Sequence, residues 1–472
     1  MLFLIYSETN DRSVKNNLGK PEYSYYFVLK EFKKVLEKIG KVVVVFDPES
    51  EVDRLYDESL ERGERCVFLS FSPPHKTAVD LRCPTIPVFA WEYDTIPNEV
   101  WEDDIKNDWS YVLKKLGQAI THSNHTVNAV KKELGEDFPI ISIPSPVWEA
   151  FEDIRIKYPA ELEMTKKVDL VVRGRVIDSS NCAFKDSAKK DDFKVNENFV
   201  KGFKYRLGAT KRHFLEWYRD VIKDLLPVKV SSGLSSLVRR AYSQGQIIVN
   251  NDFSPQQEIG FSLSGVVYTS VFNPYDGRKN WHDMVTAFCA AFVDKPDAVL
   301  VLKFTCVNSD WAFMELRQQI EKCPKHLCRI VGIHGYLEQH SYEQLIAASN
   351  FAVNSSVGEG QCLPLMEFMA CGKPAVSPAH TAMSDYIDSN VAFIVDSADE
   401  PACWPHDPRF VYRAHKQRVN WSSLKDAFSK SYKVVKEDPS LYLDMSSKSI
   451  ERISRHASQA EAISRINSFI NF

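Results

Sequence analysis

The chain has 472 residues, of which 44% are hydrophobic and 26% charged, and its net charge is −4. These values are ordinary for a soluble globular protein of two or three domains, and they argue against a general nucleic-acid binder. No run approaches the ~18 uninterrupted apolar residues that a membrane span needs. The N-terminal apolar run is five residues long and lacks a basic leader, so we predict a first β-strand rather than a signal peptide, in a cytoplasmic protein.

Short apolar runs alternate with helical patterns through residues 1–150. Between the first two runs, Val28, Phe32, Leu36 and Ile39 line one face of an amphipathic helix. This alternation predicts a parallel sheet covered by helices on both sides. Its strands are expected at 2–6, 42–46, 66–71, 86–91, 119–121 and 140–143.

The same alternation returns in residues 266–397. We therefore predict an α/β protein with two doubly wound, Rossmann-like domains, whose active site lies between them at the carboxyl ends of the strands. The second set of strands is expected at 266–271, 298–304, 329–333, 351–354 and 392–395, and the helices at 281–293, 311–322, 342–349 and 364–371.

Residues 150–262 break the pattern. The Lys-rich segment 183–212 has no clear period and predicts loops, and a basic amphipathic helix is expected at about 210–226. That helix either packs its apolar face on the first domain, which we favour, or lies on an anionic membrane surface. The predicted domains are an N-terminal domain at 1–150, an insertion at 151–262, a C-terminal domain at 263–420 and closing helices at 421–472.

The ten cysteines include no Cys-x2-Cys pair. Cys323 and Cys328 are the nearest two, and no histidine follows them at zinc-finger spacing, so we expect no zinc site. Others, such as Cys289 and Cys371, lie in apolar runs, as reduced core thiols do.

The most informative segment is 351–376, which reads FAVNSSVGEGQCLPLMEFMACGKPAV. It predicts a strand, a tight loop carrying Glu359, and a helix that begins near Leu363 and carries Glu367. Amides at a helix start can bind a phosphate, and each carboxylate can accept hydrogen bonds from neighbouring hydroxyls. A nucleotide sugar offers both groups, although two acids at this spacing also arise by chance, since a helix start favours Glu.

The full string resembles the E-x7-E signature of the retaining glycosyltransferases of family 4, which have the GT-B fold. The matching residues are Glu359-Gly360, Leu363-Pro364-Leu365, Glu367, Met369-Ala370-Cys371-Gly372 and Pro374. Cys362 departs from the pattern, because family members usually carry Gly there. The resemblance implies that Glu367 takes the ribose hydroxyls, that Glu359 faces the transferred sugar, and that the C-terminal helix crosses back to the first domain. It further implies that the phosphate and sugar oxygens meet the amides of Gly360, Gln361, Cys362 and Leu363.

Arg278 and Lys279 lie where a predicted helix begins, and two cations there suit a diphosphate leaving group. A solvated surface pair is the alternative. Lys279-Asn280 matches the family segment that holds the donor diphosphate. The family's companion Arg usually lies about five residues earlier, where this chain has Pro274, so we expect Arg278 to substitute for it.

Further contacts follow from the resemblance. The turn Gly335-Tyr336-Leu337 is similar to the loop that contacts the nucleotide base, and Gly19 lies where relatives have a Gly-rich turn near the donor phosphate.

Acceptor-side residues are expected in the first domain, where Glu92 and Asp94 follow a strand and His122 and Ser123 follow another. Glu-x-Asp is also the pattern of a metal site in GT-A enzymes, but we prefer a contact to acceptor or sugar hydroxyls.

The resemblance implies a metal-independent transferase without a cofactor other than its donor. We expect a GDP-linked mannose or deoxyhexose as donor, with a UDP-hexose as the second expectation. The acceptor would be a glycan, lipid-linked at the inner membrane, in bacterial surface-polysaccharide synthesis. The alternatives are a GT-B sugar phosphorylase or nucleotide-sugar epimerase, and a non-catalytic glycan-binding or scaffold protein.

Overall fold

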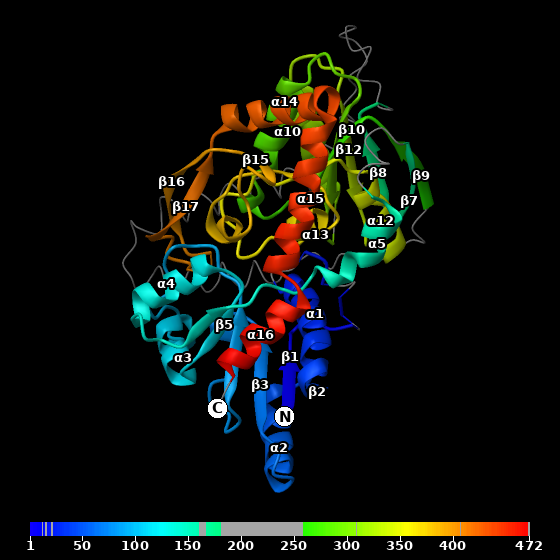
Figure 1. Ribbon diagram of the computed structural model, residues 1–472. Helices are drawn as coiled ribbons and strands as arrows, with labels where there is room; N and C mark the ends of the chain where they lie inside the picture. Colours follow the sequence, from blue (N-terminus) through cyan, green and yellow to red (C-terminus); the bar gives the residue numbers. More distant parts are fainter. Residues whose placement is uncertain are drawn as a thin grey trace, which may run out of the picture. The chain divides into compact units, whose positions relative to one another are not determined.

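Two α/β domains follow one another along the chain (Figure 1). The computed structural model describes residues 1–11, 13–14, 17–19, 22–159, 167–180, 258–307, 309–405 and 407–470. The predicted loop segment 183–212 and the basic helix at 210–226 lie outside the described residues.

The first domain is built on a parallel sheet. In the described residues it has six strands in the order β2-β1-β3-β4-β5-β6. Every residue of β3 is buried, as expected for a parallel strand covered on both faces. The strands are β1 (Leu2–Tyr6), β2 (Lys41–Val44), β3 (Cys66–Phe71), β4 (Thr85–Phe89), β5 (Ala119–Thr121) and β6 (Ile140–Ser142). The helices are α1 (Tyr23–Ile39), α2 (Pro48–Glu61), α3 (Trp109–Leu116) and α4 (Asn124–Leu134). The next helix, α5 (Glu152–Lys157), packs Ile154 in the core of the second domain.

The core of this domain uses the predicted helix face. Val28, Phe32 and Leu36 of α1 are buried in one cluster with alternate residues of β1 and β3. The largest differences from the predicted boundaries in this domain are the ends of two strands: β2 ends at Val44 rather than 46, and β4 ends at Phe89 rather than 91. Both apolar runs continue past the last paired residue, so hydrophobicity alone places the strand ends too late.

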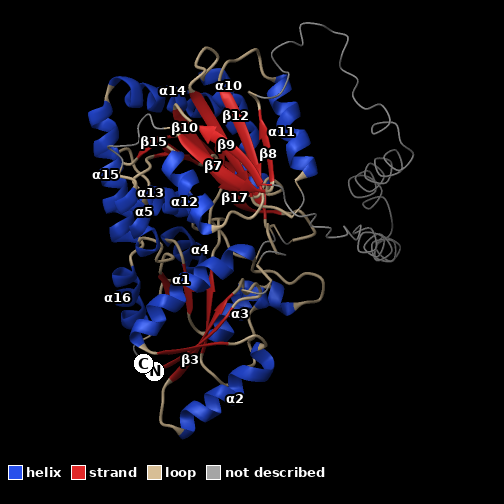
Figure 2. Ribbon diagram, turned by 90° about the vertical axis from the view of Figure 1, so that its right-hand side faces the viewer, coloured by secondary structure: helices blue, strands red, loops and turns tan. Residues whose placement is uncertain are grey.

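The second domain holds a seven-stranded sheet in the order β15-β14-β13-β10-β11-β12-β8, in which only β8 is antiparallel among the described strands. Figure 2 shows helices on both sides of these strands. The strands are β8 (Arg175–Asp178), β10 (Val266–Phe272), β11 (Ala298–Phe304), β12 (Arg329–His334), β13 (Phe351–Val353), β14 (Ala375–Ser377) and β15 (Ala392–Ile394). The helices are α10 (Trp281–Ala291), α11 (Asp310–Lys322), α12 (Gln339–Ala348) and α13 (Leu363–Ala370).

Several strands of the second domain have no counterpart in the prediction. β8 comes from the segment predicted as an insertion, yet it extends the sheet beside β12. β14 is short and follows Pro374 directly. Two antiparallel pairs are also new: β7 (Val168–Arg173) with β9 (Glu258–Leu263), and β16 (Ser397–Cys403) with β17 (Tyr412–Val419).

Three helices close the chain: α14 (Trp421–Glu437), α15 (Pro439–His456) and α16 (Gln459–Phe469). Ala462 and Ile466 of α16 are buried in the core of the first domain, and Arg465 Nη1 donates to the Ser142 carbonyl at 2.8 Å. The last helix therefore packs on the first domain (Figure 1). Among the described helices, none combines the length and the hydrophobicity that crossing a bilayer requires.

Candidate active site

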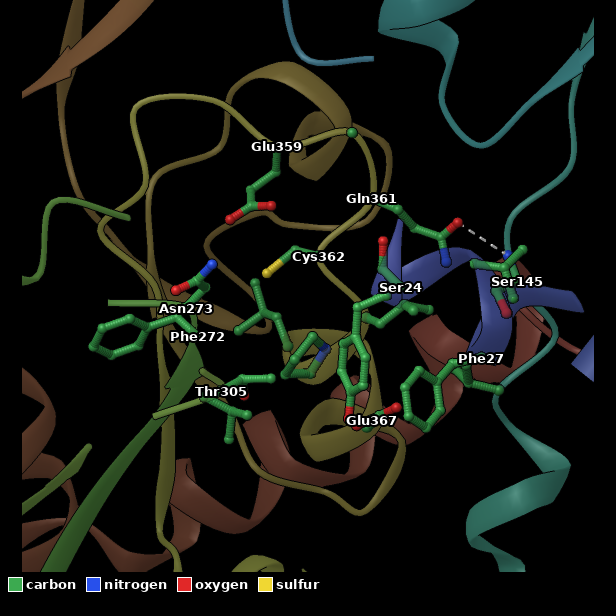
Figure 3. Close-up of a pocket in the computed structure, with 18 of the residues that line it drawn as sticks. Ser24, Phe27, Ser145, Phe272, Asn273, Thr305, Glu359, Gln361, Cys362 and Glu367 are labelled. Carbon is green, nitrogen blue, oxygen red and sulfur yellow. Dashed lines mark hydrogen bonds between the residues drawn. The ribbon is translucent and has the colours of Figure 1, made fainter. Parts of the chain in front are cut away.

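The order of strands in the second sheet creates a natural binding position. The chain runs outward from β10 to β11 and β12, and then returns to the other side of β10 with β13. Loops that leave β10 and β13 at their carboxyl ends therefore diverge, and such a switch point opens a crevice. A cavity of about 1050 Å³ lies there, and residues of both domains line it (Figure 3).

Lys279 and Glu359 meet in this cavity, although they are 80 residues apart. Lys279 Nζ lies 2.6 Å from Glu359 Oε1, which also accepts a hydrogen bond from Ser356 Oγ at 2.6 Å. The backbone N–H of Glu359 donates to Thr381 Oγ1 at 3.0 Å. Burial is the largest single influence and lowers the pKa of Lys279, but the neighbouring acidic groups, Glu359 first among them, together outweigh it, so the Lys279 pKa lies above the ordinary value. The pair therefore holds a fixed positive charge beside a fixed carboxylate.

The two cations predicted at a helix start lie at the start of α10. Arg278 and Lys279 end a short 3₁₀ turn (η7, Gly277–Lys279), and Asn280, with φ of 47°, leads into α10. Arg278 forms ion pairs with Asp276 of its own turn and with Glu92 of the first domain. Glu92 was expected to contact acceptor hydroxyls, whereas here it lines the cavity as the partner of Arg278.

Two glycines allow the domains to approach closely. A Cβ at Gly360 would lie 2.8 Å from the Ala90 Cβ, and one at Gly19 would lie 2.5 Å from the Thr305 carbonyl oxygen. Gly19 also has a φ of 80°, and its carbonyl accepts a hydrogen bond from Asn273 Nδ2 at 2.7 Å. Both glycines line the cavity, so larger residues would push its walls apart.

Cys362 adopts a conformation that explains the family's preference for Gly. Its φ of 64° and ψ of 63° are left-handed, which costs a residue with a Cβ about 1–2 kcal/mol. Cys362 is the N-cap of α13, and Pro364 follows in the first turn. The loop therefore keeps the turn that Gly would give, and Figure 3 shows the Cys362 thiol between Glu359 and Glu367.

Glu367 lies on α13 at the other side of the cavity from Glu359 (Figure 3). Burial raises the pKa of Glu367 to about 7, although the hydrogen bond from the Tyr342 hydroxyl lowers it. This carboxyl group can therefore gain or lose its proton near neutral pH.

Three polar atoms in the cavity wall have no hydrogen-bond partner among the described residues: His122 Nε2, Ser145 Oγ and Gln361 Nε2. All three side chains are buried, and buried polar groups are otherwise satisfied in folded proteins. His122 Nδ1 donates to the Ile143 carbonyl at 2.9 Å, and burial lowers its pKa to about 4. A neutral His122 thus presents a free acceptor, and Gln361 a free donor, to a bound ligand.

Lys303 is a cavity residue that the sequence analysis missed. It occupies the next-to-last position of β11 and is only 6% exposed. Within the described part of the chain its Nζ reaches the Thr305 hydroxyl at 3.4 Å and forms no ion pair. Burial lowers the Lys303 pKa to about 8. A charged residue in the otherwise apolar run AVLVLKF was the available signal.

Most of the predicted contacts share this one cavity, including Tyr336, Leu337 and Leu363. Asp94, Ser123 and Gly335 are not among the described residues that line it. Asp94 accepts hydrogen bonds from the backbone and ring of His415, on the β17 strand. Ser123 caps α4 through the Thr126 N–H, and Gly335 packs against the Arg173 carbonyl in a turn with φ of 135°.

Residues 265–404 match the family model described as glycosyl transferases group 1. Among solved structures, the chain is similar to sucrose-phosphate synthase from Thermosynechococcus elongatus, with 11% identity and a TM-score of 0.51 over 99% of this chain and 98% of that one. It is also similar to HepE from Anabaena in complex with UDP and glucose, with 12% identity and a TM-score of 0.48 over 99% and 98% of the two chains. A comparison with curated proteins found no match.

The likeness to sucrose-phosphate synthase shows the fold, because the identity is too low to carry more. The predicted GT-B architecture is thereby confirmed: two Rossmann-like domains with parallel sheets. The group 1 match covers the strands and loops that carry Lys279, Glu359 and Glu367. Fold and match together support a glycosyltransferase of the GT-B class.

Proposed function

We propose that this chain is a retaining, metal-independent glycosyltransferase that moves a hexose or deoxyhexose from a nucleotide diphosphate sugar to a glycan acceptor. The observation that carries the proposal is the meeting of Lys279 and Glu359 at the switch point, beside buried polar atoms that lack partners. A nucleotide diphosphate sugar combines an anionic centre with hydroxyls on both sides, and this cavity offers the complementary groups.

The diphosphate binds near Lys279 and Lys303. Lys279 donates one N–H to Glu359 and keeps two for phosphate oxygens. Lys303 adds a cation that no carboxylate of the described residues neutralises, and the amides at the start of α13 favour an anion. Arg278, with its two carboxylate partners, acts chiefly by holding its turn against the first domain.

The hydroxyls of the donor are shared between the two acids. Glu367 accepts from the ribose, with Tyr342 holding the carboxylate in place. Glu359 faces the transferred sugar, where His122 accepts and Gln361 donates further hydrogen bonds. These contacts satisfy two of the three cavity atoms that are otherwise buried without partners.

In the reaction, the acceptor hydroxyl oxygen forms a bond to the anomeric carbon as the bond from that carbon to the diphosphate oxygen breaks. Attack and departure occur on the same face of the sugar, and the acceptor proton passes to the departing phosphate oxygen. Glu359 is held by Lys279 and Ser356, a role of positioning rather than of a nucleophile. The rate then comes from orientation and from preorganised positive charge around the leaving group.

The proposed donor is a GDP-linked mannose or deoxyhexose, with a UDP-hexose as the second candidate, and the acceptor is a glycan of a bacterial surface polysaccharide. A panel of nucleotide sugars with and without oligosaccharide acceptors tests this, by nucleoside diphosphate release and product mass. Acceptor-dependent release with retained configuration supports the proposal. Sugar 1-phosphate formed only with added phosphate would identify a phosphorylase, and an isomerised donor without acceptor an epimerase. If the protein showed neither turnover nor thermal stabilisation by nucleotides, the result would support a non-catalytic protein instead.

A further inference from the structure

Side chains from two separated segments form a cluster of sulfur and nitrogen atoms away from the cavity. Cys289 lies in α10, whereas His326 and Cys328 lie in the loop between α11 and β12. Their potential ligand atoms all lie within 4.8 Å of one another. Cys323, the C-cap of α11, adjoins this group of three, because the Cys289 thiol donates a hydrogen bond to the Cys323 sulfur.

The spacing of these atoms fits a tetrahedral zinc ion. With Zn–S of about 2.3 Å and Zn–N of about 2.05 Å, a sulfur and a nitrogen ligand lie about 3.6 Å apart. The observed distance from Cys289 Sγ to His326 Nε2 is 3.7 Å. A set of three cysteines and one histidine is a common structural zinc shell.

The histidine is already oriented as a ligand. His326 Nδ1 donates to the Pro324 carbonyl at 2.9 Å, which leaves Nε2 with a lone pair directed at the cysteines. Zinc-bound histidines usually make such a second hydrogen bond, because it fixes the tautomer and the ring. A histidine that merely packed beside a thiol would not need this orientation.

The position of the cluster suits a structural role. Cys289 and Cys328 are 2% and 4% exposed, while Cys323 and His326 are partly exposed and give an ion a path from solvent. The loop also contacts the turn after α10, where the Leu327 N–H donates to the Val293 carbonyl at 2.8 Å. None of the four is among the described residues that line the catalytic cavity.

We propose that Cys289, His326 and Cys328 bind one zinc ion, with the neighbouring Cys323 thiol as the fourth ligand, and that the ion ties the α11–β12 loop to α10. The ion is structural and takes no part in sugar transfer, so the proposal stands whether or not the proposed function is correct. Sequence spacing does not reveal this site, because Cys289 lies in α10, whereas the other three residues follow α11.

Metal analysis of the full chain, purified without chelators from zinc-containing medium, tests the proposal. We expect about one zinc per chain, loss of bound zinc in Cys289→Ser and Cys328→Ser, and a lower unfolding temperature after chelation. Cys306→Ser, which alters a buried thiol outside the cluster, should keep the metal. His326→Gln changes a partly exposed side chain and serves if a cysteine variant fails to fold.

Cobalt gives a second readout that does not depend on activity. Co²⁺ added to the chelator-treated chain should produce a thiolate-to-metal absorption band, weaker in each cysteine variant and unchanged in Cys306→Ser. A wild-type chain that holds less than about one tenth of a zinc ion and binds none on titration would overturn the proposal. So would zinc retained equally in Cys289→Ser and His326→Gln, or a disulfide joining two of the cluster cysteines.

Discussion

Replacing Lys303 with Met should change stability and ligand binding in opposite directions. The substitution removes a buried ammonium group and keeps an unbranched side chain of similar length. Burial lowers the Lys303 pKa from 10.5 to about 8. Because a tenfold change in proton affinity is ~1.4 kcal/mol, the charged form costs the folded state ~3 kcal/mol. We therefore expect Lys303→Met to raise the free energy of unfolding at pH 7 by up to ~3 kcal/mol.

The pH dependence of unfolding tests independently whether the Lys303 charge destabilises the fold. The folded-state pKa of Lys303 is depressed, so the penalty is fully present below pH 8. As pH rises from about 8 to 10.5, the unfolded chain binds more protons than the folded chain, and this residue's penalty disappears. The stability difference between Lys303→Met and wild type should therefore shrink over that range. Urea unfolding at pH 7 and at pH 10 measures it.

Nucleotide binding should weaken in the same variant. A hydrogen bond to a charged group contributes about 1.5–3 kcal/mol, so loss of the Lys303 contact should raise the Kd for GDP or UDP about 10–100-fold. Isothermal titration measures this. Lys433→Met, at an exposed position of α14, is the matched control and should change neither quantity. A Lys303→Met variant with unchanged nucleotide affinity, or with lower stability than wild type at pH 7, would refute the reasoning.

Three further substitutions test other parts of the cavity. Lys279→Met should reduce turnover about 100-fold and also lower stability by about 3–5 kcal/mol, because it leaves the buried Glu359 carboxylate without its cationic partner. Adding Glu359→Gln to this variant should restore stability in urea unfolding but not turnover in an initial-rate assay. Glu367→Gln should weaken nucleotide binding. In the wild type, nucleotide affinity should rise with pH through about 7, and the variant should lose this rise, as followed by titration calorimetry from pH 6 to 8. An unchanged pH profile would show that Glu367 does not contact the ribose. Cys362→Gly should be about 1 kcal/mol more stable than Cys362→Ala in thermal unfolding, because only Gly relieves the left-handed strain; equal stabilities would contradict that account.

The sequence predicts the elements that are buried on both faces. The mainly apolar runs of β3 and β11 agree with the structure residue for residue, because a central parallel strand is buried on both faces. The meeting of Lys279 and Glu359 also follows from topology, since both lie after strands that end at the same edge of the sheet.

Elements that lack such a run could not be predicted. β14 has three residues after a proline, and β16 reads SADEPAC, in which alternation of polar and apolar residues is weak. These strands exist because their neighbours hold them, through β13 and β17. Local pattern carries little information about pairing with a distant strand.

The spacing of residues in the sequence could not predict the directions in which the side chains of the site point. Glu92 and Asp94 were treated alike, but Glu92 points to Arg278 in the cavity, whereas Asp94 contacts His415. Both residues follow the end of β4, where the chain no longer has the strand geometry that would direct residues two apart to the same face. In the same way, the Cys289 cluster depends on how α10 packs beside the α11–β12 loop, which no linear spacing records.

A crystal structure with bound GDP or UDP would test the central claim most directly. The account predicts the diphosphate within hydrogen-bond distance of Lys279 Nζ, the ribose hydroxyls on Glu367, and the β-phosphate directed toward Glu359. A nucleotide bound outside this cavity, or one that leaves the Lys279–Glu359 pair on the far side of its ribose from the diphosphate, would contradict it.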